Sequence, residues 1–552
     1  MSTQNRIIPL YPFLTAIYPI LFLLSVNVTD VGLKSGFRSA ALMLAFAIIT
    51  FAIALVVTHN AHRSALTSFI ITLCFFLIFF VVYAPAYHAL REVSLGGEIL
   101  GRHRYLIPAA FLLFVAAGVS VIWFSRGLTA GMQRSITRIL NLVTVILVLI
   151  PSFTIIAYAV KKQHVLATTQ DNLPAIEQSL TTKAGNVPDI YYLILDMHTS
   201  DAVMQDLMNY DDSAFTRALE ERGFFVAKCA RSNYPNTQYS ITSSLNMNYL
   251  QEMTDAYDIP YLYPLLQSSL VQRTLSETGY KVYAFESGYP FTELVDADKY
   301  FSPVMSAVDL LTYPGLTTFE SLLMQVSGGR VLYESREQLS QKMQYIIDAP
   351  YVEYRDRIIY ALDTIPALVA EPGPKFVFAH ILAPHDPFVF DEDGGTAFRR
   401  TPFSMDKDPE FGEGYGWEPY SEGYINEIIY LHKRIISIVD KLQQDSQVPP
   451  VIIIQGDHGI PRLGLVDAQY EIYSAYYVAG VDTTFLYDTI TPVNTFRLIF
   501  NALFGSHYEK LPEVIYQQGD DGAFQTVDAK LTCPAEFDSL TAEGEDQITP
   551  DD

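Results

Sequence analysis

Hydrophobic residues gather in five long runs within the first 162 residues of the chain. The runs lie near residues 8–28, 39–58, 65–84, 106–124 and 137–159. Each run is about 19–23 residues long, enough for a helix to cross the ~30 Å hydrocarbon core of a bilayer. Arg138 is the one charged residue inside them, which argues against an ion or proton transporter. We therefore expect residues 1–162 to form a membrane anchor of about five helices.

Beyond residue 188 the apolar runs become short and alternate with polar, turn-forming stretches. Clear runs cover residues 189–196, 375–382 and 451–456, and weaker ones cover 280–285 and 476–479. Such runs are typical of strands buried on both faces of a parallel sheet. Helical patterns at 202–222 and 421–445 alternate with them. We predict an α/β domain, residues 189–540, with a mainly parallel central sheet flanked by helices.

Charge follows the same division. Residues 1–162 hold 12 basic and three acidic residues, whereas the rest of the chain holds 24 basic and 57 acidic ones. This composition excludes a simple cytosolic enzyme and a secreted disulfide scaffold. An acidic domain would repel phosphate backbones, so no nucleic-acid partner is expected. We expect residues 163–188 to be a polar linker and residues 541–552 to be an acidic, disordered tail.

The distribution of basic residues does not support a C-terminal domain outside the membrane. If the C-terminal domain lies outside, five basic residues fall in inside segments and seven in outside segments. The positive-inside rule therefore leans slightly against an exterior domain. The three cysteines, Cys74, Cys229 and Cys533, form no C-x-x-C motif and say little about the compartment.

Acids and histidines follow the predicted strands. Asp196 ends the first strand, and Asp457, His458 and Gly459 follow the third. Carboxylates with an imidazole suit a divalent metal such as Mn²⁺ or Zn²⁺, and parallel strands would bring them to one edge of the sheet. The alternatives are a polar turn with a capping Asp at 457, and a helix N-cap at Asp196. His198 is either a substrate contact or a surface histidine.

Two further segments carry candidate chemistry. Residues 231–246 are dense in hydroxyls and break before a predicted helix, where a hydroxyl beside free N–H groups could face an anion or act as a nucleophile. The alternative is an ordinary set of caps and turns. His385 lies in a proline-bracketed loop after a strand, where it could donate to an anionic substrate or face solvent. His380 lies within that strand, and we expect it to be structural.

The ordered set of these motifs resembles the sulfatase-like branch of the alkaline phosphatase superfamily, over roughly residues 187–505. The anchor is similar in layout to lipoteichoic acid synthases and phosphoethanolamine transferases. The resemblance implies one divalent metal ion (Mn, Zn, Mg or Ca) and a substrate-binding role for His385. By position, the implied metal ligands are Asp196, Thr237, Asp457 and His458. Thr237 is the implied nucleophile, with Ser232 and Ser240 as rivals.

Two departures from the family pattern bear on the substrate. The anchored transferases have Glu where this chain has Asp196, and the C/S-x-P-x-R string of true sulfatases is missing. We therefore expect a hydrolase or transferase of phosphate-ester groups on a membrane lipid headgroup or envelope glycan, with its catalytic domain outside the cytoplasm. The alternatives are a strict sulfatase and a non-catalytic membrane scaffold that keeps the fold.

Overall fold

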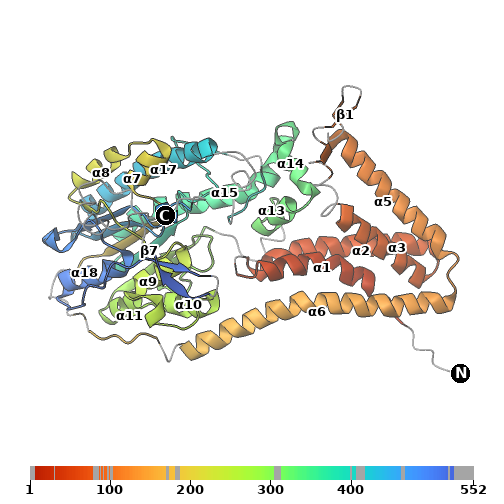
Figure 1. Cartoon of the computed structure of the whole chain (residues 1–552), viewed down its shortest axis with the longest axis horizontal. Coiled ribbons are helices and arrows are strands. Elements are labelled where there is room, and N and C mark those ends of the chain that lie inside the picture. Colours follow the sequence, from red (N-terminus) through yellow and green to blue (C-terminus); the bar gives the residue numbers. More distant parts are fainter. Residues whose placement is uncertain are drawn as a thin grey trace, which may run out of the picture. The chain divides into compact units, whose positions relative to one another are not determined.

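The computed structural model describes residues 7–527 except residues 30, 79–85, 87–88, 91–92, 96–97, 100–102, 170–172, 179, 181–186, 304–312, 398–400, 406–416, 462–465 and 520–521. The chain forms two compact units (Figure 1). The first comprises Met1–Lys161, Met305–Val352 and Phe398–Gly412, and the second comprises Lys162–Val304, Glu353–Ala397 and Glu413–Asp552. The predicted domain boundaries stay predictions, and the predicted disordered tail, 541–552, lies outside the described residues.

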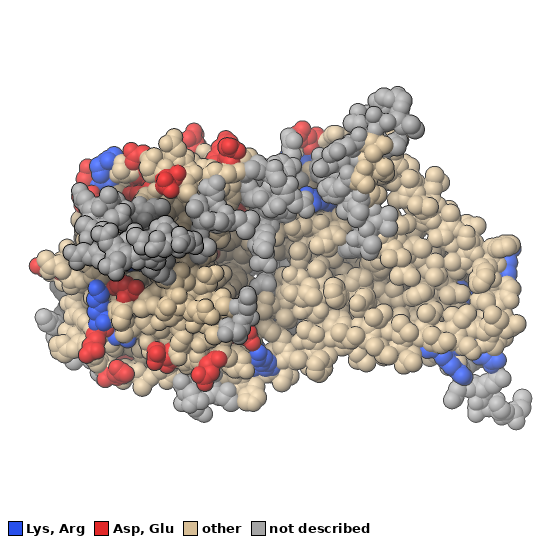
Figure 2. Space-filling view, in the orientation of Figure 1, with Lys and Arg blue, Asp and Glu red and all other residues tan. Residues whose placement is uncertain are grey.

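Each predicted apolar run overlaps a helix of the first unit. These helices are α1 (Tyr11–Val26), α2 (Phe37–Thr58), α3 (Ala61–Phe76), α5 (His103–Ser125) and α6 (Ala130–Thr169). In the part of the chain that the structure describes, three apolar stretches are long enough to cross a membrane: Lys34–Thr58, Tyr105–Ser125 and Ala130–Leu166. As described, α1 and α3 are shorter, at 16 residues each, so the predicted count of five spans is not confirmed. Figure 2 shows that uncharged side chains form almost all of this helical surface.

Segments from later in the sequence complete the first unit. They form α13 (Thr318–Gln325), η5 (Gly328–Arg330), α14 (Val331–Glu334), η6 (Arg336–Gln338) and the first part of α15 (Gln341–Thr364), beside η1 (Leu33–Gly36) and the hairpin β1 (Ser94–Leu95) and β2 (Glu98–Ile99). Phe319 of α13 packs with Ile20 and Leu24 of α1. Next to it, Arg38 Nε donates to Glu320 Oε1 at 2.7 Å, which ties α13 to the start of α2.

The second unit is built on a sheet with the described strand order β4-β9-β8-β3-β7-β5-β6. Its central strands β8 (Val451–Gly456), β3 (Ile190–Leu195) and β7 (Lys375–Ile381) are the three that the sequence predicts most clearly. They run parallel with β5 (Lys281–Phe285) and β6 (Lys299–Phe301). β9 (Ser474–Val478) is antiparallel to β8 and to β4 (Phe225–Val226). The sheet is therefore mixed but mainly parallel, as predicted.

Helices cover both faces of this sheet (Figure 1). One face carries α7 (Asp201–Met208), α8 (Ser213–Glu220) and α17 (Trp417–Asp445); the other carries α9 (Thr237–Asn246), α10 (Ile259–Gln267), α11 (Leu270–Glu277) and α18 (Pro492–Phe504). All six residues of β3 are buried, and Ile190, Tyr192 and Ile194 belong to the core beneath the second group. Short elements η4 (Leu250–Glu252), η7 (Ile365–Ala370), η8 (Val466–Gln469), η9 (Thr483–Phe485) and the hairpin β10 (Tyr516–Gln518) and β11 (Phe524–Thr526) complete the unit.

The helix predicted over residues 202–222 is two helices, α7 and α8. Asn209 adopts a left-handed conformation with φ 52°, and its N–H donates to the Gln205 carbonyl. A left-handed residue after the last turn ends a helix, and Asn accepts this conformation more readily than most residues. The hydrophobic pattern continues through the break, so periodicity alone predicts one helix.

Candidate metal and nucleophile site

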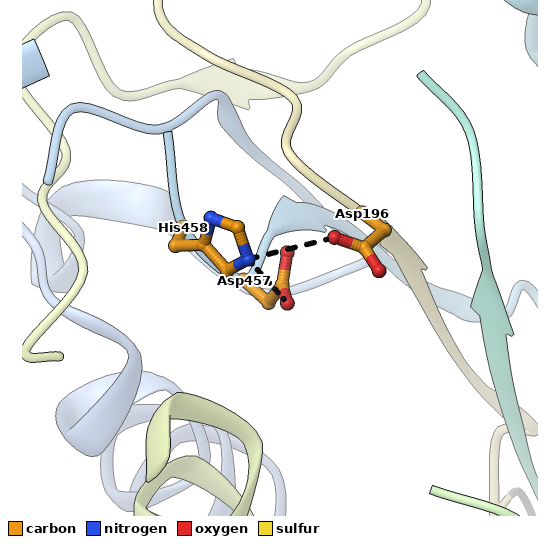
Figure 3. A group of neighbouring side chains, drawn as sticks. All are labelled: Asp196, Asp457 and His458. Carbon is orange, nitrogen blue, oxygen red and sulfur yellow. Dashed lines mark ion pairs between the residues drawn. The ribbon is translucent and has the colours of Figure 1, made fainter. Parts of the chain in front are cut away.

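Asp196, Asp457 and His458 meet at one edge of the central sheet. Asp196 directly follows β3, while Asp457 and His458 follow β8, and the two strands pair with Leu195 opposite Gly456. Parallel strands end at the same edge, so the three side chains converge (Figure 3). One ligand atom from each lies within 4.8 Å of the others, and all three residues are buried. The structure thus brings together three of the four predicted metal ligands.

Backbone contacts hold the Asp457-His458 pair in place. Asp457 Oδ1 accepts a hydrogen bond from the Met197 N–H at 3.1 Å. A Cβ at Gly459 would lie 2.1 Å from the carbonyl oxygen of Ala468, closer than any side chain allows. The sequence suggests that this glycine serves a sharp turn, but its structural reason is the close approach of a neighbouring backbone.

The donor set fits a divalent cation. Asp196 Oδ1 and Asp457 Oδ2 are buried and, among the described residues, have no hydrogen-bond partner. His458 Nε2 lies 3.6 Å from the first of these oxygens and 3.7 Å from the second. A buried carboxylate oxygen without a partner is costly, and carboxylate with imidazole suits divalent metals. These unpaired oxygens are therefore what a cation site would leave when its ion is taken away.

Thr237 is the first residue of α9 and joins this group. Its Oγ1 lies 3.2 Å from His458 Nε2, and the residue is 8% exposed. The start of a helix also presents backbone N–H groups, which favour a bound anion. A hydroxyl, a cation-binding set and an anion-binding helix start therefore lie at one place.

The rival hydroxyls are both buried: Ser232 lies in the loop before α9, and Ser240 lies within α9. Ser232 Oγ lies 2.6 Å from the Asp457 carbonyl oxygen and 3.0 Å from Ser240 Oγ. It also lies 2.6 Å from the Tyr234 carbonyl oxygen. These contacts stabilise the backbone that carries Asp457, whereas the described contacts of Thr237 place it against a predicted ligand side chain.

His385 follows β7 in the loop that the sequence singles out, with a quarter of its side chain exposed. Burial favours its neutral ring, but the charges of Asp196 and Asp386 outweigh burial and raise the pKa of His385. For Asp196, burial works to raise the pKa, but the nearby histidines, His385 first, outweigh it and lower the pKa. Tyr354 Oη donates to the carbonyl oxygens of Leu382 and, at 3.2 Å, of His385. The site thus favours an ionised Asp196 beside a His385 ring that binds its proton more tightly than an ordinary histidine.

His198 lies away from this group by its described contacts. It is fully buried, and its Nε2 lies 2.8 Å from His432 Nε2. Burial lowers the pKa of His198 to about 3, and its ring stacks with Phe215. The expectation of a surface histidine is therefore wrong. The role in substrate binding stays a prediction without a described contact to support it.

His380 lies beside Asp196, a contact that the sequence does not reveal. It lies within β7, and its Nε2 is 3.3 Å from Asp196 Oδ2. We expected a structural residue because the sequence shows only a histidine inside a buried strand. The available signal was its position: β7 pairs with β3, which places a polar residue of one strand beside the acid that follows the other.

Comparisons with known proteins give fold likeness only. No family model matches the sequence, and no curated protein matches it. Among solved structures, the C-terminal periplasmic domain of EcEptC from Escherichia coli, in complex with Zn, is 12% identical with a TM-score of 0.42. It matches over 64% of this chain and 96% of that chain.

Two further solved structures are similar to a comparable degree. The integral membrane lipooligosaccharide phosphoethanolamine transferase A (EptA) from Neisseria meningitidis is 13% identical, over 89% of this chain and 95% of that chain, with a TM-score of 0.36. An alkaline phosphatase superfamily protein from Vibrio parahaemolyticus is 11% identical, over 65% and 81%, with a TM-score of 0.36. Sulfatases are also among the similar structures.

Proposed function

We propose that this protein is a membrane-anchored, metal-dependent hydrolase or transferase of phosphate-ester groups, with Thr237 as its nucleophile. One observation carries the proposal. The Thr237 hydroxyl lies 3.2 Å from His458 Nε2, in the group where Asp196 and Asp457 each bury a carboxylate oxygen that no other described residue hydrogen-bonds. A scaffold without catalytic function has no need of this arrangement.

Asp196, Thr237, Asp457 and His458 would hold one divalent cation. When bound, the cation would lower the pKa of the Thr237 hydroxyl and offset the negative charge of the phosphoryl oxygens. Asp196 suits this role because its pKa is lowered, so it stays ionised without giving up its charge to a proton. The N–H groups at the start of α9 would orient the anionic substrate.

The chain's own residues supply the transfer steps. The Thr237 hydroxyl would release its proton to water before the reaction and take one back from water when Thr237 is released. Its Oγ1 would form a bond to phosphorus, and the bond from phosphorus to the leaving oxygen would break. His385, with its raised pKa, would give its proton to that leaving oxygen. Water or an acceptor hydroxyl would then give a proton back to His385, attack the same phosphorus and release Thr237. The phosphate group is transferred without oxidation or reduction.

The substrate class follows from the anchor. Three apolar helices that can cross a membrane favour a lipid headgroup or an envelope glycan close to the bilayer. Cys229 is disulfide-bonded, and disulfides persist mainly in oxidising compartments, which supports an extracytoplasmic domain against the charge count. Reporter fusions after Lys162, with alkaline phosphatase or a cytoplasmic fluorescent protein, should give phosphatase activity. Fluorescence alone would place the domain inside.

The test of the reaction is hydrolysis of a chromogenic phosphodiester and a chromogenic phosphomonoester by the full chain in detergent. Thr237→Ala should lower turnover by about a thousandfold or more, because a covalent nucleophile is lost. It should leave the divalent metal bound, since two carboxylates and an imidazole remain. Thr237→Ser keeps a hydroxyl and should keep measurable activity. Near-normal activity of Thr237→Ala would remove the proposed mechanism.

A further inference from the structure

The Asp196 carboxylate has two oxygens in different surroundings. Oδ2 lies 3.3 Å from His380 Nε2 in an ion-pair contact, while Oδ1 lies 3.6 Å from His458 Nε2. Among the described residues, neither Asp196 Oδ1 nor His380 Nε2 has a partner with hydrogen-bond geometry. The backbone is fixed as well, because the Asp196 N–H donates to the Ile381 carbonyl at 2.9 Å. One oxygen is therefore directed to the neighbouring strand, and the other is directed to the cation-binding group.

A threonine lies on the far side of the His380 ring. Thr292 Oγ1 is 2.8 Å from His380 Nδ1, and both residues are buried. The negative charge of the Asp196 carboxylate favours a hydrogen on the ring nitrogen that lies 3.3 Å from it, because a carboxylate can only accept. In the neutral ring this leaves Nδ1 as an acceptor. The Thr292 hydroxyl can donate to it at 2.8 Å, which is shorter than its 3.2 Å contacts with the Tyr289 carbonyl oxygen and with Ser287 Oγ. Thr292 thus favours the ring form that can donate to Asp196.

We propose that His380 is a positioning residue for the metal site, held in its donor form by Thr292. By engaging Oδ2, His380 fixes the rotation of the Asp196 carboxylate and leaves Oδ1 for the cation. This inference rests on the proposed function, since it needs a cation at Asp196, Asp457 and His458. Residues that orient a metal-binding side chain in this way typically change metal affinity by 10–100-fold when they are altered.

The experiment measures the affinity of the purified full chain for Mn²⁺ and Zn²⁺ by competition with a chromophoric chelator, together with the melting temperature of the metal-free protein. Thr292→Val keeps the shape but removes the donor, and should weaken metal binding about tenfold. His380→Leu should weaken it by more, about 10–100-fold. His380→Gln places an amide nitrogen near the position of Nε2 and should restore most of the affinity.

Thr274→Val is the matched control. Thr274 is equally buried, and its hydroxyl has no hydrogen-bond partner among the described residues, so metal binding should not change. The positioning role is supported if Thr292→Val binds metal more weakly while its metal-free form melts at the same temperature as metal-free Thr274→Val. This holds even if His380→Leu fails to fold. Wild-type affinity in Thr292→Val and His380→Leu would overturn this inference alone. A wild-type chain that binds neither ion would overturn the proposed function and this inference with it.

Discussion

The two units of the molecule bury carboxylates in contrasting ways. In the first unit Glu320 lies against a permanent counter-charge, because Arg38 Nε donates to it at 2.7 Å and the same guanidinium donates to the Tyr313 carbonyl. In the second unit Asp196 and Asp457 lie among histidines and, within the described residues, keep one unpaired oxygen each. The charge of Glu320 is already balanced by Arg38, whereas Asp196 and Asp457 offer oxygens that a cation could bind.

A further buried carboxylate, that of Asp212, lies beside a histidine and not beside a permanent counter-charge. Burial raises the pKa of Asp212 to about 7, and its Oδ1 lies 3.2 Å from His432 Nδ1. Asp212 thus binds a proton far more readily than an ordinary carboxyl, while the pKa of Asp196 is lowered and Asp196 stays ionised. Burial alone therefore does not mark a functional acid. A buried acid that stays ionised and has an oxygen without a described hydrogen-bond partner is the better indication of a functional site.

The largest expected effect comes from Asp457→Asn, which keeps the acceptor for the Met197 N–H but removes the charge. We expect it to abolish stoichiometric divalent metal and lower phosphoesterase turnover by about a thousandfold. The metal-free protein should melt at the same temperature or higher, because a buried negative charge is gone. Elemental analysis and melting curves with and without a chelator check this. Full metal occupancy in the variant would contradict the ligand assignment.

Glu320→Gln breaks the completed pair and should act on stability instead. We expect a loss of about 2 kcal/mol, below the ~3–5 kcal/mol typical of fully buried pairs, because the Arg38 side chain is 19% exposed. Activity on a soluble phosphodiester should not change. The control is Asp440→Asn at the surface pair with Arg222, where we expect below ~1 kcal/mol. Equal losses of stability in the two variants would show that the Arg38–Glu320 pair stabilises the fold no more than a surface ion pair does.

Asp212→Asn should change how the stability of the fold depends on pH, because the pKa of Asp212 is raised. With a raised pKa, folded Asp212 binds a proton between about pH 4 and 7 that the unfolded chain releases, so wild-type stability falls as pH rises through this window. The variant lacks this loss and should gain about 2 kcal/mol on wild type between pH 5 and 7. Neighbouring Asp201, His198 and His432 are common to both proteins. Parallel pH curves of urea unfolding would refute the prediction.

The smallest expected effect is that of Ser240→Ala. It removes the 3.0 Å contact with Ser232 Oγ, which is worth about 1 kcal/mol of stability. Turnover should stay within a few-fold of wild type, because the described contacts of Ser240 are with the loop before α9. A Ser240→Ala variant that folds, binds metal and has no activity would move the nucleophile from Thr237 to Ser240.

The sequence predicts both the sheet and the position of the site, because both follow from where the buried parallel strands end. Strands buried on both faces appear as short apolar runs, and the polar residues that end them, Asp196 and Asp457, must lie at one edge of a parallel sheet. The start of α9 at Thr237 was likewise visible, because Pro235 and Asn236 interrupt the chain just before it. Local pattern and strand direction together were sufficient for these features.

Features that depend on contacts between distant segments were not predictable in this way. The contacts of His380 with Thr292 and with Asp196 join segments that are far apart in the sequence. A histidine inside a buried strand gives no sign of which residue it faces. The attachment of α13 to α2 through Glu320 and Arg38 spans 282 positions of sequence. Side-chain partners across such distances are set by tertiary packing, which the hydrophobic pattern does not encode.

The central claim is that Thr237 carries the phosphate group during the reaction. Its most direct test is mass spectrometry of the metal-loaded full chain, quenched in acid after incubation with a slow phosphodiester substrate. We predict a phospho-adduct on the peptide that contains Thr237, present in wild type and absent both in Thr237→Ala and after removal of the metal. An adduct on Ser232 or Ser240, or active turnover with no adduct on any residue, would contradict the account.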